Sequence, residues 1–432
     1  MKNKSILKLF FIIIVLNIIP SALLGMFNIS NTIYSILYAA VYIIQTLIMF
    51  IFYKQNKVRV NKKDLTVIIS IIFIEIITFI YCLLIFKEYD YNEILVSISV
   101  FTNIINFIIL TNKINITKEE LFWFLRKIIV IGIIAGATNI ILNFKSLLNF
   151  SAITGSYEVK FSSFFPNRNT FGILMVICCI SNQYIIIKKR KRKRKNKNKH
   201  IYIQLFFIIN LLLTMSRNSI IGLLVFYIFS YIIKYIKYRY KLGTKEIAKL
   251  TLIILTIIVG IVMLSKNVML LDRMEKLLFR TDSLESGSGR FILWKNGFEI
   301  FKNNNIITGI GRYKAIEFNK NIYNSKLVYF HSIYIEILAE YGIMGIMLLL
   351  SFINFIRNKI NKSKLEKEYL NFTKATFYTF LFISVFESTT RFSIGYADTM
   401  SLMYFCSLPI LIGNIKEDIE VKTTKEKEFN EN

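Results

Sequence analysis

A polar segment of this chain, residues 266–330, gathers residue types that bind and transfer phosphate-containing groups. It carries Arg290 and Arg312, and it is followed directly by His331, one of only two histidines in the chain. A guanidinium binds phosphate oxygens in pairs, and a histidine exchanges protons near neutral pH. Eleven of the 55 Lys and Arg residues lie between residues 266 and 330. The segment therefore predicts an anion-binding site beside a proton donor or acceptor.

Within this segment, the sequence SGSGRFILWKNG sets Arg290 after two glycines and Trp294 four residues later. The spacing of Arg290, Trp294 and Phe298 predicts that they share one face of a helix. Such a helix can lie along a membrane surface, with Trp294 among the lipid headgroups and Arg290 turned toward an anionic ligand. An ordinary surface helix has the same pattern, so both interpretations stay open.

The sequence ITGIGRYK follows, with Gly309 and Gly311 just before Arg312 and Lys314. Glycines let backbone amides approach a ligand while the two cations supply charge, as in loops that cradle phosphate. The spacing is not that of a nucleotide-binding fingerprint, so neither ATP nor NAD is predicted.

His331 precedes an apolar stretch that contains Glu336 and Glu340. The amino-terminal end of a helix attracts anions, so His331 is a candidate for proton transfer there, although a structural role is equally open. Carboxylates at membrane depth are costly, so the glutamates are expected to face a polar cavity or a partner such as Arg217 or Arg391. A structural ion pair and a catalytic role both fit this pattern.

Two further motifs precede apolar stretches. TMSRNS places Arg217 at the head of a helix, where it can bind an anion or extend toward lipid headgroups. FPNRNTFG supplies Asn167 and Asn169, whose amides suit sugar hydroxyls, although the same residues make an ordinary turn at the start of a helix.

The elements that must position these residues are membrane-spanning helices. The chain is 54% hydrophobic, its mean hydropathy is +0.51, and its apolar runs recur along the whole length. Since only helices satisfy their own backbone in lipid, the sequence predicts an all-α polytopic membrane protein of about 12 transmembrane helices with a long extracytoplasmic loop at 266–330. The expected spans are residues 6–27, 33–53, 65–86, 94–111, 122–143, 170–187, 201–215, 218–236, 250–265, 331–356, 372–390 and 397–413.

The formal net charge of +28 is concentrated in connections between the spans. The basic runs 54–63, 188–199, 234–249 and 357–367 all fall on one side if the N-terminus is cytoplasmic. This is the distribution of the positive-inside rule, so lipid is the expected partner and nucleic acid is not. The four cysteines lie in apolar spans, and no disulfide is predicted.

The motifs from residue 161 to residue 350, in their order, resemble the O-antigen ligase/polymerase superfamily. The resemblance rests on FPNRNTFG, TMSRNS, SGRFILWKNG, GIGRYK and HSIYIEILAEYG. It implies a GT-C-type glycosyltransferase bundle whose core, residues 144–356, follows N-terminal helices in 1–143 and precedes C-terminal helices in 357–413 and a cytoplasmic tail in 414–432.

The resemblance also implies the chemistry. Arg217 and Arg290 would hold the diphosphate of an undecaprenyl-diphosphate-linked glycan donor, Arg312 would assist them, and His331 would activate or orient the acceptor. The substrate-binding set is completed by Asn167, Asn169, Trp294, Glu336 and Glu340. No cofactor is expected, and no metal, because no cluster of carboxylates is apparent among the outward-facing segments.

The expected function is a polymerase of oligosaccharide repeat units for capsule, exopolysaccharide or O-antigen, in the cytoplasmic (inner) membrane with its active site facing outside. A flippase and a chain-length regulator are the expected protein partners. Richness in Ile, Lys, Asn, Phe and Tyr is typical of AT-rich genomes, many of them in bacteria without lipopolysaccharide, which favours a polymerase. Two alternatives stay open: an O-antigen ligase-type or protein O-oligosaccharyl transferase, and a flippase or transporter of lipid-linked oligosaccharide.

Overall fold

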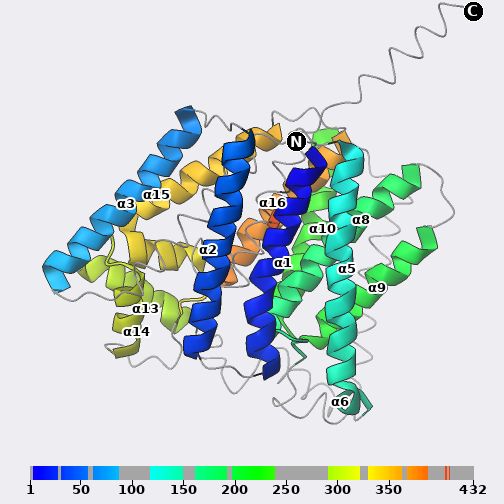
Figure 1. Ribbon diagram of the computed structural model, residues 1–432, viewed down its shortest axis with the longest axis horizontal. Helices are drawn as coiled ribbons and strands as arrows, with labels where there is room; N and C mark the ends of the chain where they lie inside the picture. The colour runs from blue at the N-terminus through cyan, green and yellow to red at the C-terminus, as the bar shows by residue number, and fades with distance from the viewer. Residues whose placement is uncertain are drawn as a thin grey trace, which may run out of the picture.

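Every regular element among the residues that the computed structural model describes is an α-helix (Figure 1). The structure describes residues 3–27, 31–56, 62–86, 117–148, 161–191, 197–238, 290–321, 329–361 and 367–387, with residues 404, 405 and 408. The helices are α1 (Asn3–Phe27), α2 (Asn31–Asn56), α3 (Lys62–Phe86), α5 (Lys118–Leu142), α6 (Phe144–Leu148), α8 (Arg168–Lys191), α9 (Lys197–Leu213), α10 (Arg217–Tyr238), α13 (Arg290–Asn303), α14 (Arg312–Asn321), α15 (Ile333–Asn361) and α16 (Lys367–Phe386).

The centre of the bundle is α8. Of its most apolar stretch, 83% is buried inside the protein, against 39% for α5 and for α15. A helix that is apolar on all sides is expected to be enclosed, and residues 173–180 are at most 2% exposed. Because α5, α9, α10 and α16 pack around it, the first turn of α8 is held in a fixed place.

Four described helices are long and apolar enough to cross a membrane: α1, α5, α8 and α15. Shorter apolar helices lie within α2, α3, α9 and α10. The all-helical prediction is confirmed for the described residues, whereas the count of about 12 spans stays a prediction. The expected spans 94–111 and 250–265, and most of 397–413, lie outside the described residues.

The polar segment 266–330 is not a plain loop where the structure describes it. Residues 290–303 and 312–321 form α13 and α14, which pack against each other and against α15. Figure 1 shows both helices in the lower half of the view, away from the N-terminus at the top. Residues 266–289, which include Arg273 and Arg280, lie outside the described residues.

A break in α15 holds this pair of helices in place. Gly342 leaves the helical conformation, with φ of 59° and ψ of −151°. The amides of Ile343 and Met344 then donate to the carbonyls of Ile306 and Ile307, at 2.9 and 3.1 Å. On the other side of the break, the carbonyl of Glu340 accepts from the amide of Gly311. The segment 306–311 therefore satisfies the backbone groups that the broken helix leaves open.

Replacing Gly342 by alanine is expected to destabilise the protein by about 1–3 kcal/mol, because the glycine backbone conformation is strained for any side chain. A Cβ at this position would also lie 2.4 Å from the carbonyl oxygen of Ile306. Thermal unfolding of the purified protein in detergent would measure the loss. Ser351→Ala, at an exposed position on the same helix, is the matched control. Equal melting temperatures for the two variants would contradict this account of the break.

Candidate functional site

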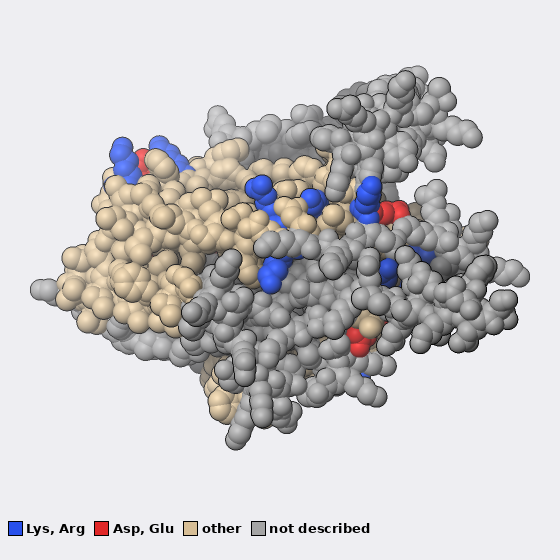
Figure 2. Space-filling model, turned by 90° about the horizontal axis from the view of Figure 1, so that it is seen from above, with Lys and Arg blue, Asp and Glu red and all other residues tan. Residues whose placement is uncertain are grey.

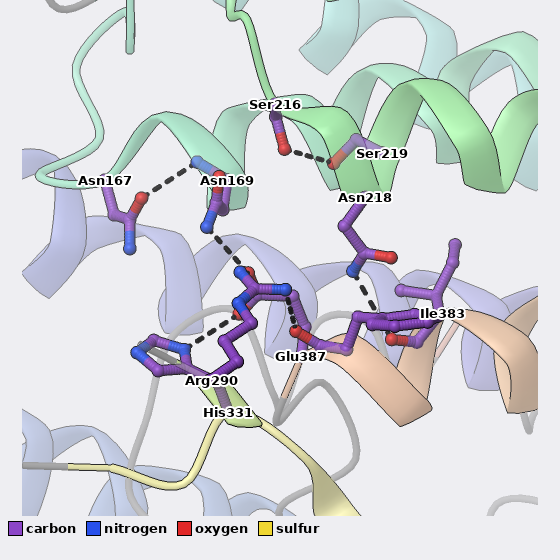
Figure 3. A network of polar contacts seen from close by, with 10 residues as sticks. Asn167, Asn169, Ser216, Asn218, Ser219, Arg290, His331, Ile383 and Glu387 are labelled. Atoms are coloured by element: carbon purple, nitrogen blue, oxygen red, sulfur yellow. Dashed lines mark hydrogen bonds and ion pairs between the residues drawn. The ribbon is translucent and has the colours of Figure 1, made fainter. Parts of the chain in front are cut away.

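Polar side chains from three separate segments meet around one carboxylate, that of Glu387 (Figure 3). Glu387 directly follows the last residue of α16 and is only 8% exposed. Its Oε1 accepts hydrogen bonds from Asn169 Nδ2 at 2.6 Å and from Arg290 Nη2 at 2.7 Å. Its Oε2 lies 3.4 Å from Nδ1 of His331. One acidic group thus joins three residues that lie far apart in the sequence.

Arg290 is the first residue of α13, and its guanidinium closes the end of α16. Nη2 pairs with the Glu387 carboxylate, and Nη1 donates to the backbone carbonyl of Phe386. A cation at the carboxyl end of a helix binds both the free carbonyls and the negative end of the helix dipole. The side chain is 21% exposed, so the guanidinium is partly removed from water and still reachable.

His331 lies in a turn immediately before α15. Its φ is +53°, which is uncommon for a residue other than glycine and typical of functional positions. The neighbours Phe330 and Ser332 are buried, at 0% and 2% exposed, so the turn is fixed and the imidazole is directed toward Glu387. A hydrogen bond from His331 to an ionised carboxylate places a proton on Nδ1, and in a neutral ring the lone pair is then on Nε2.

The two asparagines at the start of α8 have different roles in the structure. Oδ1 of Asn167 accepts from the backbone amide of Asn169 at 2.8 Å, which is the contact of a helix N-cap. The side chain of Asn167 is exposed, whereas Asn169 uses its amide on Glu387. Of the two, Asn169 therefore belongs to the polar cluster, and Asn167 holds the helix start.

Arg217 begins α10 beside this cluster. The next residue, Asn218, donates from Nδ2 to the carbonyl of Ile383 at 3.3 Å, and the same carbonyl accepts the amide of Glu387 at 3.1 Å. The start of α10 and the backbone of Glu387 are therefore both bonded to the same carbonyl oxygen of α16. The side chain of Arg217 is half-buried, and Ser216 and Ser219 bond to each other on the same turn (Figure 3).

Arg312 lies at the start of α14, and Glu336 and Glu340 lie in α15 before its break. All three are buried, at 7%, 1% and 4% exposed. Arg312 starts α14, next to the segment that seals the break in α15, and none of the contacts found between described residues joins it to Arg290, His331 or Glu387. The suggested partner Arg391 lies outside the described residues. The Gly311 amide, next to Arg312, donates to the carbonyl of Glu340, so the start of α14 lies against α15 at this point.

The prediction that Gly309 and Gly311 offer their amides to a ligand is wrong. The Gly309 amide donates to the carbonyl of Asn305 at 2.8 Å, and the Gly311 amide to that of Glu340 at 2.9 Å. Both glycines have positive φ, and a Cβ at Gly309 would lie 2.4 Å from the backbone of Glu340. The glycines are needed because the loop approaches α15 closely, so no amide is left for phosphate at these two positions.

Trp294 and Phe298 do not share the exposure that their spacing suggests. The Trp294 ring packs against Phe291 and Phe386, with centroids 5.4 and 5.9 Å apart, and its Nε1 is buried. Phe298 is 50% exposed. Each residue turns about 100° around a helix, so a side chain eight residues after Arg290 has already rotated by about 80° away from it. Trp294 therefore supports the end of α16, and Phe298 faces outward.

Glu387 is the residue that the sequence did not single out. The predicted span 372–390 contained it near its end, so its carboxylate was not considered as a site residue. The available signal was an acidic residue at the outer end of an apolar run that ends in Phe386. A carboxylate at such a position needs a partner, and that need indicates a site.

The arrangement can bind an anion and move a proton. Arg290 supplies permanent positive charge, and His331 presents Nε2 away from the carboxylate that orients its ring. Glu387 balances the charge of Arg290 in the absence of a ligand.

Comparison with known proteins adds the family. The family model for O-antigen ligase matches residues 203–350, a segment that holds Arg217, Arg290 and His331 but neither Asn169 nor Glu387. A search of curated proteins found no significant match. The match and the apolar helices make this an integral membrane protein of the glycosyltransferase-like kind that assembles glycans. The match over residues 203–350 supports the resemblance to the O-antigen ligase/polymerase superfamily that the sequence motifs indicate.

Proposed function

We propose that this protein polymerises undecaprenyl-diphosphate-linked oligosaccharide repeat units at the outer face of the cytoplasmic membrane, for capsule, exopolysaccharide or O-antigen. The observation that carries the proposal is the joining of Arg290 and His331 through Glu387. Sugar transfer from a diphosphate needs a cation at the leaving group and a base at the incoming hydroxyl. The cluster brings both to one place without requiring a metal ion in the proposed reaction.

In this reaction, the acceptor hydroxyl oxygen attacks the anomeric carbon of the donor sugar. The bond between that carbon and the diphosphate oxygen breaks, and the hydroxyl proton passes to Nε2 of His331. Arg290 and Arg217 bind the charge that develops on the leaving undecaprenyl diphosphate. Glu387 holds the Nδ1 proton of His331 and stabilises the imidazolium that forms, as the acid of a catalytic triad does for its histidine.

The direction of the helices supports an outward-facing site. α8, α10 and α15 begin near the cluster, whereas α8 and α15 end in the basic stretches at 188–191 and 357–361. α16 runs the opposite way, from Lys367 to the residue before Glu387. Figure 2 looks onto the end of the molecule away from α13 and α14, and it shows Lys and Arg side chains spread over the described part of that surface. A basic end is typically cytoplasmic, so the cluster at the other end would face outside.

The remaining assignments are extensions of this proposal. Asn169 positions the carboxylate, Trp294 supports the end of α16, and Glu336, Glu340 and Arg312 support the segment next to the site. Asn167 holds the first turn of α8. The core would extend over residues 144–356, with the site completed by α16. A flippase would supply the repeat units, and a chain-length regulator would act on the product.

Reconstitution tests the function directly. The purified protein in liposomes, given undecaprenyl-diphosphate-linked repeat units, is expected to produce a ladder of longer glycans, and His331→Ala is expected to lower the rate by about 10²–10⁴-fold. Gel electrophoresis of the released glycans measures chain length. Transfer of single units to a lipid or protein acceptor would indicate a ligase instead. Movement of unchanged units across the bilayer would indicate a transporter, and either result would refute polymerisation.

The two asparagines of α8 provide a matched pair. Asn169→Ala removes a hydrogen bond to a charged group, so the rate is expected to fall by about tenfold because His331 and Arg290 lose a fixed carboxylate. Asn167→Ala removes the helix cap and is expected to cost about 1 kcal/mol of stability with little change in rate. Steady-state rates and melting temperatures would be measured side by side. A larger rate loss for Asn167→Ala would instead favour contact of Asn167 with the sugar.

A further inference from the structure

The outward face of α13 is apolar and basic at once. Phe291, Ile292 and Phe298 are 63%, 53% and 50% exposed, and Lys295 and Lys302 are exposed between and beyond them. At about 100° per residue, positions 291, 295, 298 and 302 fall within about 60° of one another around the helix. The opposite face, with Leu293, Asn296, Gly297 and Ile300, is buried. One stripe of α13 therefore stays outside the protein although its side chains are large and apolar.

This stripe continues into the surface of a membrane-spanning helix. Ile306 and Ile307, just after α13, are 42% and 62% exposed, and their carbonyls are bonded to the amides at 343 and 344 of α15. From there, Ile343, Met347 and Leu350 are exposed at the helical spacing of one face. The exposed apolar side chains therefore continue from α13 to α15, and backbone hydrogen bonds join the two segments.

The depth of this region points the same way. Thr78 of α3 donates to the carbonyl of Thr308 at 3.2 Å. Thr78 lies eight residues before the end of α3 at Phe86, which is about 12 Å along the helix axis. The segment after α13 therefore lies beside the apolar part of α3 and not beyond its end. At that depth we expect lipid as well as water around it.

We propose that α13 is an interfacial helix covered by the lipid bilayer, with Phe291, Ile292 and Phe298 among the acyl chains and Lys295 and Lys302 against anionic phosphates. The 14 residues of α13 are too few to cross a bilayer, and an exposed apolar face flanked by lysines fits its surface. Charge complementarity favours lipid as the occupant, because the exposed residues of this stripe include two lysines, and the one carboxylate on that side, Glu299, is only partly exposed and accepts from Asn303.

The lipid-covered face of α13 does not depend on the reaction, but the role that it gives to Arg290 rests on the proposed function. Arg290 is the first residue of α13 and lies next to Phe291. A helix held at headgroup depth fixes its first residue at the depth of lipid phosphates. The diphosphate of a lipid-linked donor would then meet Arg290 without leaving the bilayer surface.

Fluorescence quenching in liposomes tests the proposal. In a Trp123→Phe background, Phe298→Trp adds one reporter on the stripe, and Lys320→Trp adds one at an exposed position of α14. Lipids brominated on their acyl chains are expected to quench most of the fluorescence added at position 298, and acrylamide in the water little of it. The reporter at position 320 is expected to behave in the opposite way. Phe291→Trp serves as a second reporter if the variant at 298 does not fold.

Two results would overturn the proposal that lipid covers α13, and one further variant tests the role of the lysines. Quenching at position 298 by acrylamide and not by brominated lipid would place the stripe in water and overturn the proposal. Protection from both quenchers would mean that protein covers the stripe, as in a second copy of the chain, and would also overturn it. If lipid does cover the stripe, Lys295→Gln with Lys302→Gln is expected to weaken quenching by brominated lipid at position 298 in anionic vesicles. These results do not require catalysis, so they remain valid if the proposed reaction fails its own test.

Discussion

Replacing Arg290 by alanine is expected to lower the rate of glycan transfer by about 10²–10³-fold, the loss seen when one preorganised donor is removed from developing negative charge. The guanidinium begins α13, reaches the end of α16 and is 21% exposed, so it is fixed before the substrate arrives. Because the proposed role of Arg290 is to bind charge that grows as the diphosphate leaves, its removal should lower kcat more than it raises KM.

Two variants separate this role from a structural one. Arg290→Lys keeps the charge but loses the paired geometry, so its activity is expected to lie between that of alanine and that of the native protein. Lys320→Ala, at an exposed position near the end of α14, is the control for general loss of positive charge and should keep the native rate. Steady-state assays with matched melting temperatures are required. A native kcat in Arg290→Ala would remove this residue from the reaction.

Much of the fold follows from the pattern of apolar residues. The predicted spans at 170–187 and 331–356 correspond to α8 and α15, since apolar runs of this length bury or cross as helices. The interruption at TMSRNS does separate α9 from α10, and Arg217 does begin a helix. These features are local, because composition and helix-start residues decide them within a few positions of the chain.

Only part of the candidate site could be predicted from residue types and apolar runs. Arg290, His331 and Asn169 were identified by residue type and by their place at the ends of apolar runs, and the structure brings them together. Glu387 was missed because its importance comes from the meeting of the end of α16 with Asn169, Arg290 and His331, which no local pattern encodes. The partner of a buried charge is a tertiary fact, although the need for one is visible in the sequence.

The glycine segment shows the opposite error. Gly309 and Gly311 beside Arg312 have the composition of a phosphate loop, yet they close the break at Gly342. Positive φ and close backbone approach require glycine whether the neighbour is a ligand or another helix, so glycine alone cannot distinguish the two cases. The sequence correctly indicated glycines at a close backbone approach, but the neighbour that they approach is α15 and not a ligand.

The internal ion pair has a consequence for substrate binding. Arg290 has Glu387 as a partner when no ligand is present, so a donor diphosphate must compete with a carboxylate for the same guanidinium. A partly buried arginine without a counter-charge would be costly, and the carboxylate removes this cost at the expense of affinity. If the diphosphate replaces Glu387 at Arg290, we expect the carboxylate to bind His331 more closely than the present 3.4 Å.

Glu387→Gln is therefore expected to change binding and turnover in opposite directions. Glutamine preserves the shape of the side chain and can still accept from Asn169, but it no longer neutralises Arg290. Diphosphate binding should tighten by up to about tenfold, since loss of a like-charge competitor is worth on the order of 1 kcal/mol at a partly exposed site. The rate of transfer should fall by about 10²-fold or more, because His331 loses the carboxylate that fixes its tautomer and stabilises its charged form.

Calorimetric titration with inorganic pyrophosphate measures the first effect, and single-turnover transfer measures the second. Glu317→Gln is the matched control, since Glu317 pairs with Lys314 on α14 and has no described contact with the cluster. If Glu387→Gln weakened pyrophosphate binding, the carboxylate would be holding Arg290 in place for the ligand and not competing with it. If binding tightened while the rate stayed native, Glu387 would be a counter-ion of Arg290 alone, and His331 would act without it. Only the combination of tighter binding and slower transfer agrees with one carboxylate that serves Arg290 before the donor binds and His331 afterwards.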